Sequence, residues 1–262
     1  MGLRTEIRKL LREINLIIGR NSSADEIGAL LKRLKPQTTN IPLIRIGGKN
    51  DGGYLVPDDL QGISACFSPG VSNIAEFEFN LAERGIKCFL ADFSVDRAPL
   101  EHENFYFTKK FLGSVENDIF TTLSEWTKNS APEQGDLLLQ MDIEGAEYNV
   151  FHEASGDLLK RFRIIVAEFH SFDMVFEKNG LRLIEATFDK ILKEFEVVHI
   201  HPNNSRKPSR FKGYEVPPLL EFTFLRRDRI SSCSPTKNFS HPLDAPNLPK
   251  KSDVSLPQCW YK

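Results

Sequence analysis

Three acidic residues follow an apolar run in the middle of the chain, a pattern that can support catalysis. Asp142, Glu144 and Glu147 come directly after Leu138–Met141. If this run is a strand, it delivers Asp142 to the carboxyl end, the edge where open α/β sheets bind ligands. A helix that begins here would offset part of the repulsion among the acids through its positive N-terminus. An acidic helix start without a catalytic role is the alternative, and the string alone does not separate the two.

Two further predicted strands end in groups that can move protons. Glu168 and His170 follow the apolar run Ile164–Ala167, and His201 ends another apolar run. Because the carboxyl ends of strands converge on one edge of such a sheet, we expect these three residues to lie near Asp142. An alcohol is a poor nucleophile at neutral pH and benefits from a general base, so all four are candidate catalytic residues. Imidazole has the pKa nearest to neutral pH.

A turn with a single glycine follows the first strand of the predicted sheet. Ser68 and Gly70 lie in this turn, and Asp92 ends the next predicted strand, 22 positions after Gly70. In doubly wound folds a carboxylate about 20 residues past the glycine turn accepts hydrogen bonds from a ribose hydroxyl. The three-glycine pattern that admits a pyrophosphate is absent. S-adenosylmethionine has a ribose but no phosphate and does not require it. A capped turn with a solvent-facing Asp92 is the alternative.

A glycine-rich stretch lies upstream of this turn. Residues 47–53 contain four glycines, which mark tight turns or a close approach of the backbone to another group. A plain hairpin is one interpretation of the stretch. The other is a flap that contacts the cofactor, and its candidate binding residues are Asp51, Gly53 and Tyr54.

Short apolar runs alternate with amphipathic segments from about residue 40 onward, which is typical of βαβ units and a parallel sheet. The last two predicted strands, Glu196–His201 and Leu219–Arg226, are joined by a proline-rich link that cannot form a helix. Because a parallel crossover normally needs a helix, these two strands should pair antiparallel. The other predicted strands are Ile63–Ser68, Lys87–Asp92, Asn104–Phe107, Leu137–Asp142 and Arg163–Glu168, and the predicted helices are residues 74–84, 117–128, 145–160 and 180–195.

The helix predicted over residues 74–84 has signals at both ends. Asn73, followed three residues later by Glu76, has the spacing of a capping box. Gly85 fits the C′ position, where a left-handed glycine ends a helix. The buried stripe of this helix is expected to consist of Ile74, Phe77 and Leu81.

The pattern divides the chain into three parts. Residues 1–39 are expected to form two helices that pack as a cap on the main domain. Ser22 or Ser23 is the candidate N-cap residue of the second helix. A dimer contact or a membrane-surface helix is the alternative for this part. Residues 40–227 form the main α/β domain. Residues 228–262 are rich in Pro and Ser but contain regularly placed apolar residues, which predicts an extended tail held on the surface.

Composition excludes several classes of protein. The chain has 262 residues, of which 34 are basic and 36 acidic, so its formal net charge is −2. This balance argues against a chain that wraps nucleic acid or coats an anionic membrane. No run of about 18 apolar residues could span a bilayer, and the charged start is not a signal peptide. The four cysteines form no CxxC pair, so we expect reduced thiols in a cytoplasmic protein.

These motifs together resemble the FkbM family of S-adenosylmethionine-dependent methyltransferases. The resemblance rests on the Asp142–Glu147 string, the Ile165–His170 strand end and the Gly70 turn with Asp92, and it covers roughly residues 40–226. It departs from the family at Ser68–Ser72, where many members have an Asp and further glycines. The resemblance implies a Rossmann-like class I methyltransferase fold, with a mostly parallel seven-stranded sheet, an antiparallel last strand and helices on both faces.

The resemblance also implies O-methylation of a hydroxyl on a sugar, another small molecule or a glycan. Two rival functions stay open: a non-catalytic binding protein on a methyltransferase fold, and an NAD or nucleotide-sugar enzyme. Carboxylates clustered with imidazole could also hold a divalent cation that activates the hydroxyl, although the sequence assigns no metal ligands. The candidate catalytic residues are Asp142, Glu168, His170 and His201, and the candidate cofactor-binding residues are Asp51, Gly53, Tyr54, Ser68, Gly70, Asp92 and Asp142.

Overall fold

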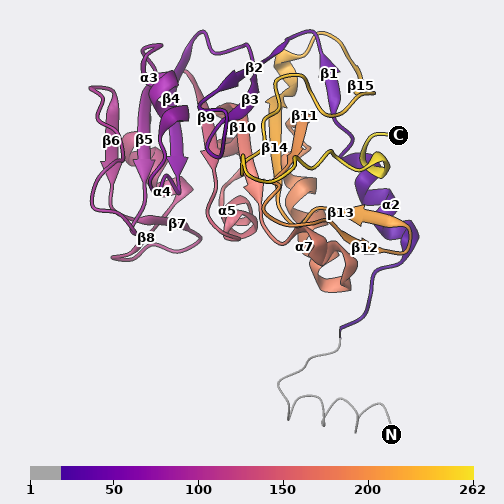
Figure 1. Cartoon of the computed structure of the whole chain (residues 1–262). Coiled ribbons are helices and arrows are strands. Elements are labelled where there is room, and N and C mark those ends of the chain that lie inside the picture. Colours follow the sequence, from indigo (N-terminus) through magenta and orange to yellow (C-terminus); the bar gives the residue numbers. More distant parts are fainter. Residues whose placement is uncertain (1–18) are drawn as a thin grey trace, which may run out of the picture.

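A seven-stranded sheet forms the centre of the structure (Figure 1). This computed structural model describes residues 19–262, so the first of the two helices expected at the N-terminus lies outside the described residues. The strand order across the sheet is β11-β14-β10-β9-β4-β5-β6. The strands are β4 (Ile63–Pro69), β5 (Lys87–Ala91), β6 (Phe105–Thr108), β9 (Asp136–Met141), β10 (Phe162–Phe169), β11 (Phe195–Pro202) and β14 (Leu220–Arg226).

One strand of this sheet runs against the others. β14 pairs antiparallel with both of its neighbours, β10 and β11, whereas the pairs from β10 to β6 are parallel. The predicted antiparallel pairing of the last two strands is therefore confirmed. The proline-rich link between them contains a small hairpin, β12 (Ser209–Phe211) and β13 (Tyr214–Val216), in place of a crossover helix. The Rossmann-like α/β fold expected from the sequence is confirmed.

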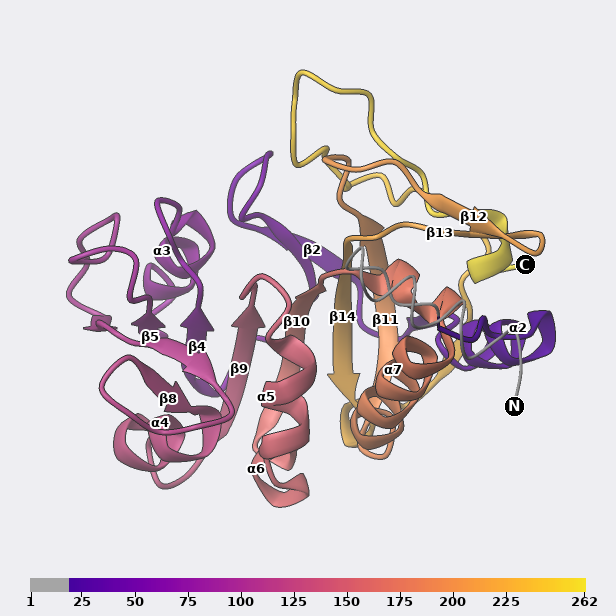
Figure 2. The same cartoon turned by 90° about the horizontal axis from the view of Figure 1, so that it is seen from below.

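The two faces of the sheet carry different elements, as Figure 2 shows. Helices α4 to α7 cover one face, and α3 and a β2–β3 hairpin cover the other. Because side chains alternate along a strand, Phe67 and Leu139 pack under the first layer, and Cys66 and Leu138 pack under the second. The elements are β2 (Leu43–Ile46), β3 (Tyr54–Pro57), α3 (Glu76–Ala82), α4 (Leu123–Ser130), α5 (Glu147–Glu153), α6 (Gly156–Lys160) and α7 (Lys178–Ile191).

The helix predicted over residues 117–128 begins later than expected. Residues Phe120–Thr122 form the short strand β8, which pairs with β7 (Phe111–Gly113). Aromatic and β-branched residues fit a pleated strand better than a helix. The side chain of Thr122 then caps α4 by accepting the backbone N–H of Glu125 at 3.1 Å.

The helix predicted over residues 145–160 is two helices. Ser155 lies between α5 and α6 and caps the second by accepting the backbone N–H of Leu158 at 3.1 Å. A serine hydroxyl competes with the helix for backbone groups, so it favours a break here. The acidic string therefore precedes a helix of only seven residues.

The predicted capping box before α3 is wrong. The N-cap of α3 is Ala75, which makes no side-chain cap, and Ile74 is 41% exposed rather than part of the buried stripe. The reason is that the turn extends further: Ser72 has φ +42°, and its N–H is held by Asp92. The end of the helix is as predicted, since Gly85 has φ +79°.

The segments on either side of the main domain meet. The helix α2 (Ala24–Arg33) begins with a capping box at Ser23, and β1 (Gln37–Thr39) pairs with β15 (Cys233–Pro235) of the tail. The tail then crosses in front of β14 and β11 (Figure 1) and ends with Trp260 fully buried in the core. The described residues also form three short 3-10 helices, η1 (Phe172–Phe176), η2 (Arg227–Arg229) and η3 (Gln258–Trp260), the last of which belongs to the tail. No helix among residues 19–262 is long and apolar enough to cross a membrane.

Candidate active site

Two adjoining cavities lie beyond the carboxyl ends of the parallel strands. The first cavity measures about 700 Å³ and is lined by residues that follow β4, β5 and β9. The second cavity measures about 470 Å³ and is lined by residues that follow β9 and β10, and by the tail. Asp51, Asp142 and Glu144 line both, so these residues form the junction between the cavities. Volumes of this size are typical of small-molecule sites.

Gly70 holds the turn after β4 against the end of β9. It has φ +87°, and a Cβ at this position would lie 1.7 Å from the carbonyl oxygen of Asp142. Its N–H donates to the carbonyl of Ala91 at 2.9 Å. Only glycine meets both the left-handed backbone and the close approach. The single glycine of the turn therefore positions Asp142 as well as lining the first cavity.

Asp92 lies at the end of β5 and lines the first cavity. Its Oδ2 accepts the N–H of Ser72 at 2.8 Å, and its Oδ1 accepts the N–H and the hydroxyl of Ser94 at 2.8 and 2.6 Å. The alternative of a solvent-facing Asp92 is wrong, because the residue is 3% exposed. The serines fix the carboxylate, and since a carboxylate oxygen can accept two bonds, Oδ2 keeps the capacity to bind a ligand hydroxyl.

A chain of buried polar side chains lies beneath the first cavity. The hydroxyl of Ser68 contacts Oε1 of Glu78 and lies 2.6 Å from Oε1 of Gln140, whose Nε2 donates to the Tyr54 hydroxyl at 3.2 Å. Burial raises the pKa of Glu78 to about 7, although the Ser68 contact opposes this. Ser68 itself lines neither cavity and acts through Glu78 and Gln140, which line the first.

The glycine-rich stretch is both a hairpin and a contact to the site. It joins β2 to β3, and Asp51 and Tyr54 reach the first cavity. Gly53 lines neither cavity, because a Cβ there would lie 2.0 Å from the carbonyl oxygen of Gly48. Its role is to close the hairpin rather than to meet a ligand.

Glu147 organises the loop between β9 and α5. Its side chain is fully buried, and Oε1 accepts the backbone N–H groups of Ile143 and Gly145, each at 3.1 Å. The same oxygen lies 3.1 Å from Nδ1 of His170. The last acid of the string is therefore structural. It holds the loop that presents Asp142 to both cavities.

His170 lies among three carboxylates. Its Nε2 is 3.3 Å from Glu144 and 3.7 Å from Asp142, and its Nδ1 contacts Glu147. Burial alone lowers the pKa of His170, but the hydrogen bond to Glu147 and the nearby negative charges raise it above its usual value. Burial raises the pKa of Asp142 to about 7, and the neighbouring carboxylates add to this while His170 opposes it. The opposite charges of His170 and Asp142 therefore favour the ionised form of each other.

Three titratable residues form a row across the antiparallel part of the sheet. Glu168 on β10 lies directly opposite Glu221 on β14, and Glu221 lies opposite His201 on β11. Burial raises the pKa of Glu168 and raises that of Glu221 to about 8, and burial lowers the pKa of His201 to about 4. Glu168 lines the second cavity, whereas His201 lines neither. Asp142, Glu168 and His170 thus all line the second cavity. His201, the fourth candidate catalytic residue, lies on the far side of Glu221.

The sequence analysis missed several residues of the site. Glu221 could have been found, since it interrupts an apolar strand, and Glu78 could have been found, since it lies on the apolar stripe of α3 with Leu81. Asn247 carries no comparable signal. It lies in the tail, yet its Nδ2 donates to Asp51 at 3.2 Å and to Glu221 at 2.5 Å. Only the folding of the tail over the sheet brings it there.

The acidic and basic residues that line the first cavity are all acids. Among the described residues that line it, none is a Lys, Arg or His. The second cavity is more mixed, because Arg206 and His170 line it together with hydroxyl and amide groups. The carboxylates that line the first cavity are Asp51, Glu78, Asp92, Asp142 and Glu144.

Comparison with known proteins agrees with this geometry. The family model described as the methyltransferase FkbM domain matches residues 62–214, more than half of the chain. A comparison with curated proteins finds no match. One similar solved structure is named a "putative RNA methyltransferase" from Pyrococcus horikoshii, with 13% identity, 78% of this chain and 99% of that chain covered, and a TM-score of 0.35. Another is a "putative hemolysin" from Streptococcus thermophilus, with 10% identity, 88% of this chain and 71% of that chain covered, and a TM-score of 0.34.

The family match spans most of the residues that line the two cavities. It includes the Gly70 turn, Asp92, the Asp142 loop and the Glu168 strand end. The two structural similarities are too low to bear on activity. On the strength of the family match, the chain belongs to the FkbM methyltransferase domain family and is a methyltransferase.

Proposed function

We propose that the protein is an S-adenosylmethionine-dependent O-methyltransferase that acts on a hydroxyl of a sugar, another small molecule or a glycan. The observation that carries the cofactor assignment is the charge of the first cavity, which is lined by carboxylates and, among the described residues, by no Lys or Arg. A pyrophosphate cofactor such as NAD would meet only negative charge there. S-adenosylmethionine has no phosphate and carries a positive sulfonium, so an acidic wall suits it.

The residues of the first cavity fit the parts of this cofactor. Asp92 is held by Ser72 and Ser94 and keeps acceptor capacity for ribose hydroxyls. The rings of Phe111 and Phe120 line the same cavity and offer apolar surface for a purine. When bound, the cofactor supplies an electrophilic methyl group. The protein has only to hold it and to align an acceptor.

Asp142 is the residue best placed to take the proton of the acceptor. It lines both cavities, and its Oδ1 is buried without a hydrogen-bond partner among the described residues. A base with a pKa near 7 combines the ionised form with a useful driving force for proton transfer. As the acceptor oxygen takes the methyl group, its proton passes to Asp142. His170, 3.7 Å away, stabilises the ionised form of Asp142 before the transfer.

The second cavity is the proposed acceptor site. Besides Asp142 and Glu168, its wall contains Ser171, Asn203 and Arg206. Hydroxyl, amide and guanidinium groups can each make hydrogen bonds to a hydroxyl-rich molecule. This polar wall supports a sugar-like acceptor over an apolar one.

Cofactor binding is tested by calorimetry with S-adenosylmethionine, S-adenosylhomocysteine and NAD. We expect the first two to bind and NAD not to bind. Asp92→Asn removes the charge that strengthens the ribose hydrogen bonds, so it should weaken S-adenosylhomocysteine binding by about 1.5–3 kcal/mol, or about 10- to 150-fold. Asp96→Asn is the matched control, because Asp96 is exposed in the same loop and pairs with Lys109. Tight NAD binding, or no effect of Asp92→Asn, would contradict the assignment.

Reaction type is tested with S-adenosylmethionine that carries a ¹³C-labelled methyl group. Sugars, methyl glycosides and simple amines are offered in parallel, and the ¹³C shift of the product tells an O-methyl from an N- or C-methyl group. Asp142→Asn should lower kcat about 10²- to 10⁴-fold while S-adenosylhomocysteine still binds. Transfer to amines alone would refute O-methylation. Parental turnover by Asp142→Asn would refute its role as the base.

A further inference from the structure

A second cluster of acids lies beside Asp142 and has no role in the proposed methyl transfer. Oxygens of Asp51, Glu168 and Glu221 all lie within 4.8 Å of one another. Glu168 is 2% exposed and Glu221 is 6% exposed. The three residues come from the β2–β3 loop, from β10 and from β14, so the tertiary fold alone assembles them.

The sheet itself forces two of these acids together. Glu168 and Glu221 are direct cross-strand partners in the antiparallel pair of β10 and β14. Side chains directly opposite each other on one face have Cβ atoms about 4.5–5.5 Å apart, and like charges in this arrangement are destabilising. Because the register is fixed along the whole length of both strands, neither side chain can leave the row. A cation between the two carboxyl groups would relieve this repulsion.

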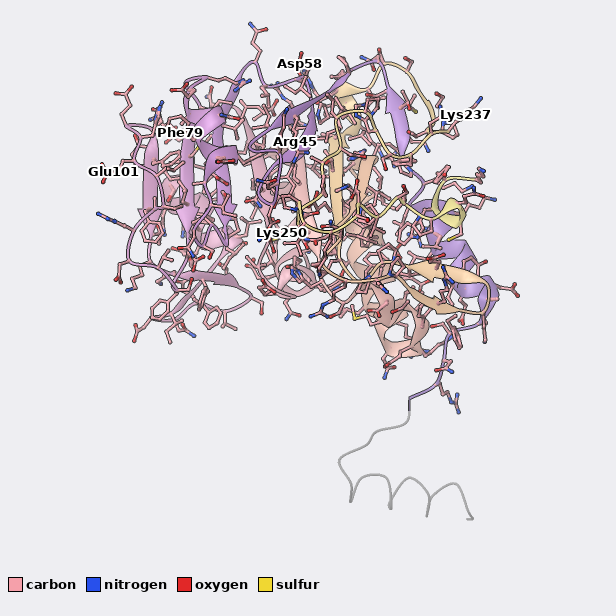
Figure 3. All side chains as sticks on the ribbon, in the orientation of Figure 1. Arg45, Asp58, Phe79, Glu101, Lys237 and Lys250 are labelled. Atoms are coloured by element: carbon pink, nitrogen blue, oxygen red, sulfur yellow. The ribbon has the colours of Figure 1, made fainter. Side chains whose placement is uncertain are left out.

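No basic side chain among residues 19–262 forms an ion pair with Asp51 or Glu168. Glu221 has only His201, at 3.6 Å. Arg45, labelled on β2 in Figure 3, uses its guanidinium on the carbonyl oxygens of Gly48, Asn50 and Leu243. Among the described residues, the cluster therefore has no direct ion pair with a Lys or Arg side chain, although the charge of Arg45 acts on Glu221 from beyond ion-pair distance.

Unpaired oxygens point to a missing ligand with positive charge. Oε2 of Glu168 and Oδ1 of Asn247 are buried and have no hydrogen-bond partner in the described part of the chain. The amide nitrogen of Asn247 donates to both Asp51 and Glu221, which fixes that side chain at the cluster. Glu168 also lines the second cavity, which gives the cluster an entry path. A buried acceptor that is left unpaired destabilises the fold, and a charged one does so more strongly.

We propose that Asp51, Glu168 and Glu221 bind a divalent cation of the Mg²⁺ or Mn²⁺ type. Carboxylate and amide oxygens are the ligands that these hard cations take, and there is no sulfur or nitrogen in the set. The cation balances the repulsion across β10 and β14. Asn247 of the tail holds two of the proposed ligands, because its amide nitrogen donates to Asp51 and to Glu221.

The neighbouring set of Asp142, Glu144 and His170 is the weaker of the two cation sites. Its oxygen and nitrogen ligand atoms are also within 4.8 Å of one another, but His170 already balances part of its charge, and the side chain of Glu144 is 89% exposed. We therefore assign the cation to Glu168 and its partners. This assignment stands on geometry and does not depend on the proposed function. Only a role of the cation beside the acceptor would rest on that function.

The site is tested by titrating the full chain with Mn²⁺ alone and following free Mn²⁺ by electron paramagnetic resonance. We expect one bound ion per chain, displaced by Mg²⁺. Glu168→Gln should weaken Mn²⁺ binding at least tenfold, whereas Glu144→Gln should leave it within about twofold. No bound Mn²⁺ in the parent, or binding that survives Glu168→Gln, would overturn the proposal.

Thermal unfolding gives a second readout that needs neither cofactor nor acceptor. Mn²⁺ or Mg²⁺ should raise the Tm of the parent, because an ion that binds only the folded state stabilises it. Glu168→Gln should raise the Tm measured without metal, because it removes one of two like charges that face each other across β10 and β14. The same variant should abolish the increase in Tm that Mn²⁺ or Mg²⁺ causes in the parent. If Glu168→Gln does not fold, Glu221→Gln serves for both measurements. If Mn²⁺ or Mg²⁺ still raises the Tm of a folded variant, the cation site is refuted. A loss of S-adenosylmethionine binding would contradict the proposed function but would not refute the cation site.

Discussion

Glu78 allows the clearest quantitative test of the structure. Its carboxyl group is 3% exposed beneath the first cavity, and Ser68 lies against it. The Ser68 hydroxyl has one proton but two oxygen neighbours, Glu78 Oε1 and Gln140 Oε1. Because the Gln140 amide nitrogen donates to Tyr54, its oxygen has to be an acceptor. A protonated Glu78 that donates to Ser68 would satisfy all these contacts at once, because the Ser68 proton is then free for Gln140.

The pKa of Glu78 sets the free energy that ionisation of this residue costs in the folded state. Burial raises the pKa of Glu78 from 4.5 to about 7, and each unit corresponds to about 1.36 kcal/mol, so the folded state pays about 3 kcal/mol to ionise it. The folded state holds the proton more tightly than the unfolded state. The stabilising contribution of the protonated group is therefore complete below pH 4.5 and is lost as the pH rises through about 7.

Glu78→Gln replaces the protonated acid with an uncharged group that can make the same donation to Ser68. We expect its free energy of unfolding, relative to the parent, to increase by about 3 kcal/mol between pH 4 and pH 7.5. Urea unfolding at each pH measures this without cofactor. The fluorescence of the buried Trp126 and Trp260 reports the transition.

Glu83→Gln is the matched control, because Glu83 is exposed at the end of the same helix. An exposed substitution of this kind usually changes stability by less than about 0.5 kcal/mol, and it should keep the pH profile of the parent. A stability difference between Glu78→Gln and the parent that stays constant from pH 4 to pH 7.5 would refute the protonation of Glu78. A difference that falls with rising pH would refute the direction of the pKa shift.

Two further substitutions test how the site is held. Gly70→Ala places a side chain on a backbone with φ +87° and sets its methyl group 1.7 Å from the carbonyl oxygen of Asp142. The variant should therefore lose at least about 2 kcal/mol of stability in a urea melt, and an unchanged midpoint would contradict the close approach. Arg163→Met should cost about 3 kcal/mol, because Arg163 is 7% exposed and pairs with Asp59 and Asp136 at the base of the sheet, whereas Arg210→Met, at an exposed pair, should cost less than about 1 kcal/mol. Equal costs for the two arginine variants would contradict the burial of the Arg163 pairs.

Local patterns predicted most of the elements. The strands β4 and β10 lie within one residue of their predicted bounds, because apolar runs bounded by turn signals need no distant contact to be recognised. The antiparallel pairing of β14 was predictable because prolines exclude a crossover helix. The errors fell where two local preferences compete, as at Phe120–Thr122, where strand pairing with β7 replaced the start of a helix.

The site was predictable only in part. Asp92 and Asp142 were correctly expected at strand ends, and both line the first cavity. Strand ends, however, say nothing about which residues of a row across the sheet lie at a cavity. His201 and Glu168 end their strands alike, yet Glu168 lines a cavity and His201 does not. The two side chains lie in one row with Glu221 between them, so they share a face of the sheet, and their positions across the sheet separate them.

The amino-acid order alone accounts for the alternation of strands and helices, the antiparallel end of the sheet and the acids at its carboxyl edge, because these depend on spacing along the chain. Contacts between distant segments decide the rest. Glu168 pairs with Glu221, which lies 53 positions further along the chain, and Asn247 contacts Glu221 from 26 positions further still. Such contacts form only when register and tail docking are settled together by burial of the whole core. That is why the acidic string was visible in the sequence and the cluster proposed to bind a cation was not.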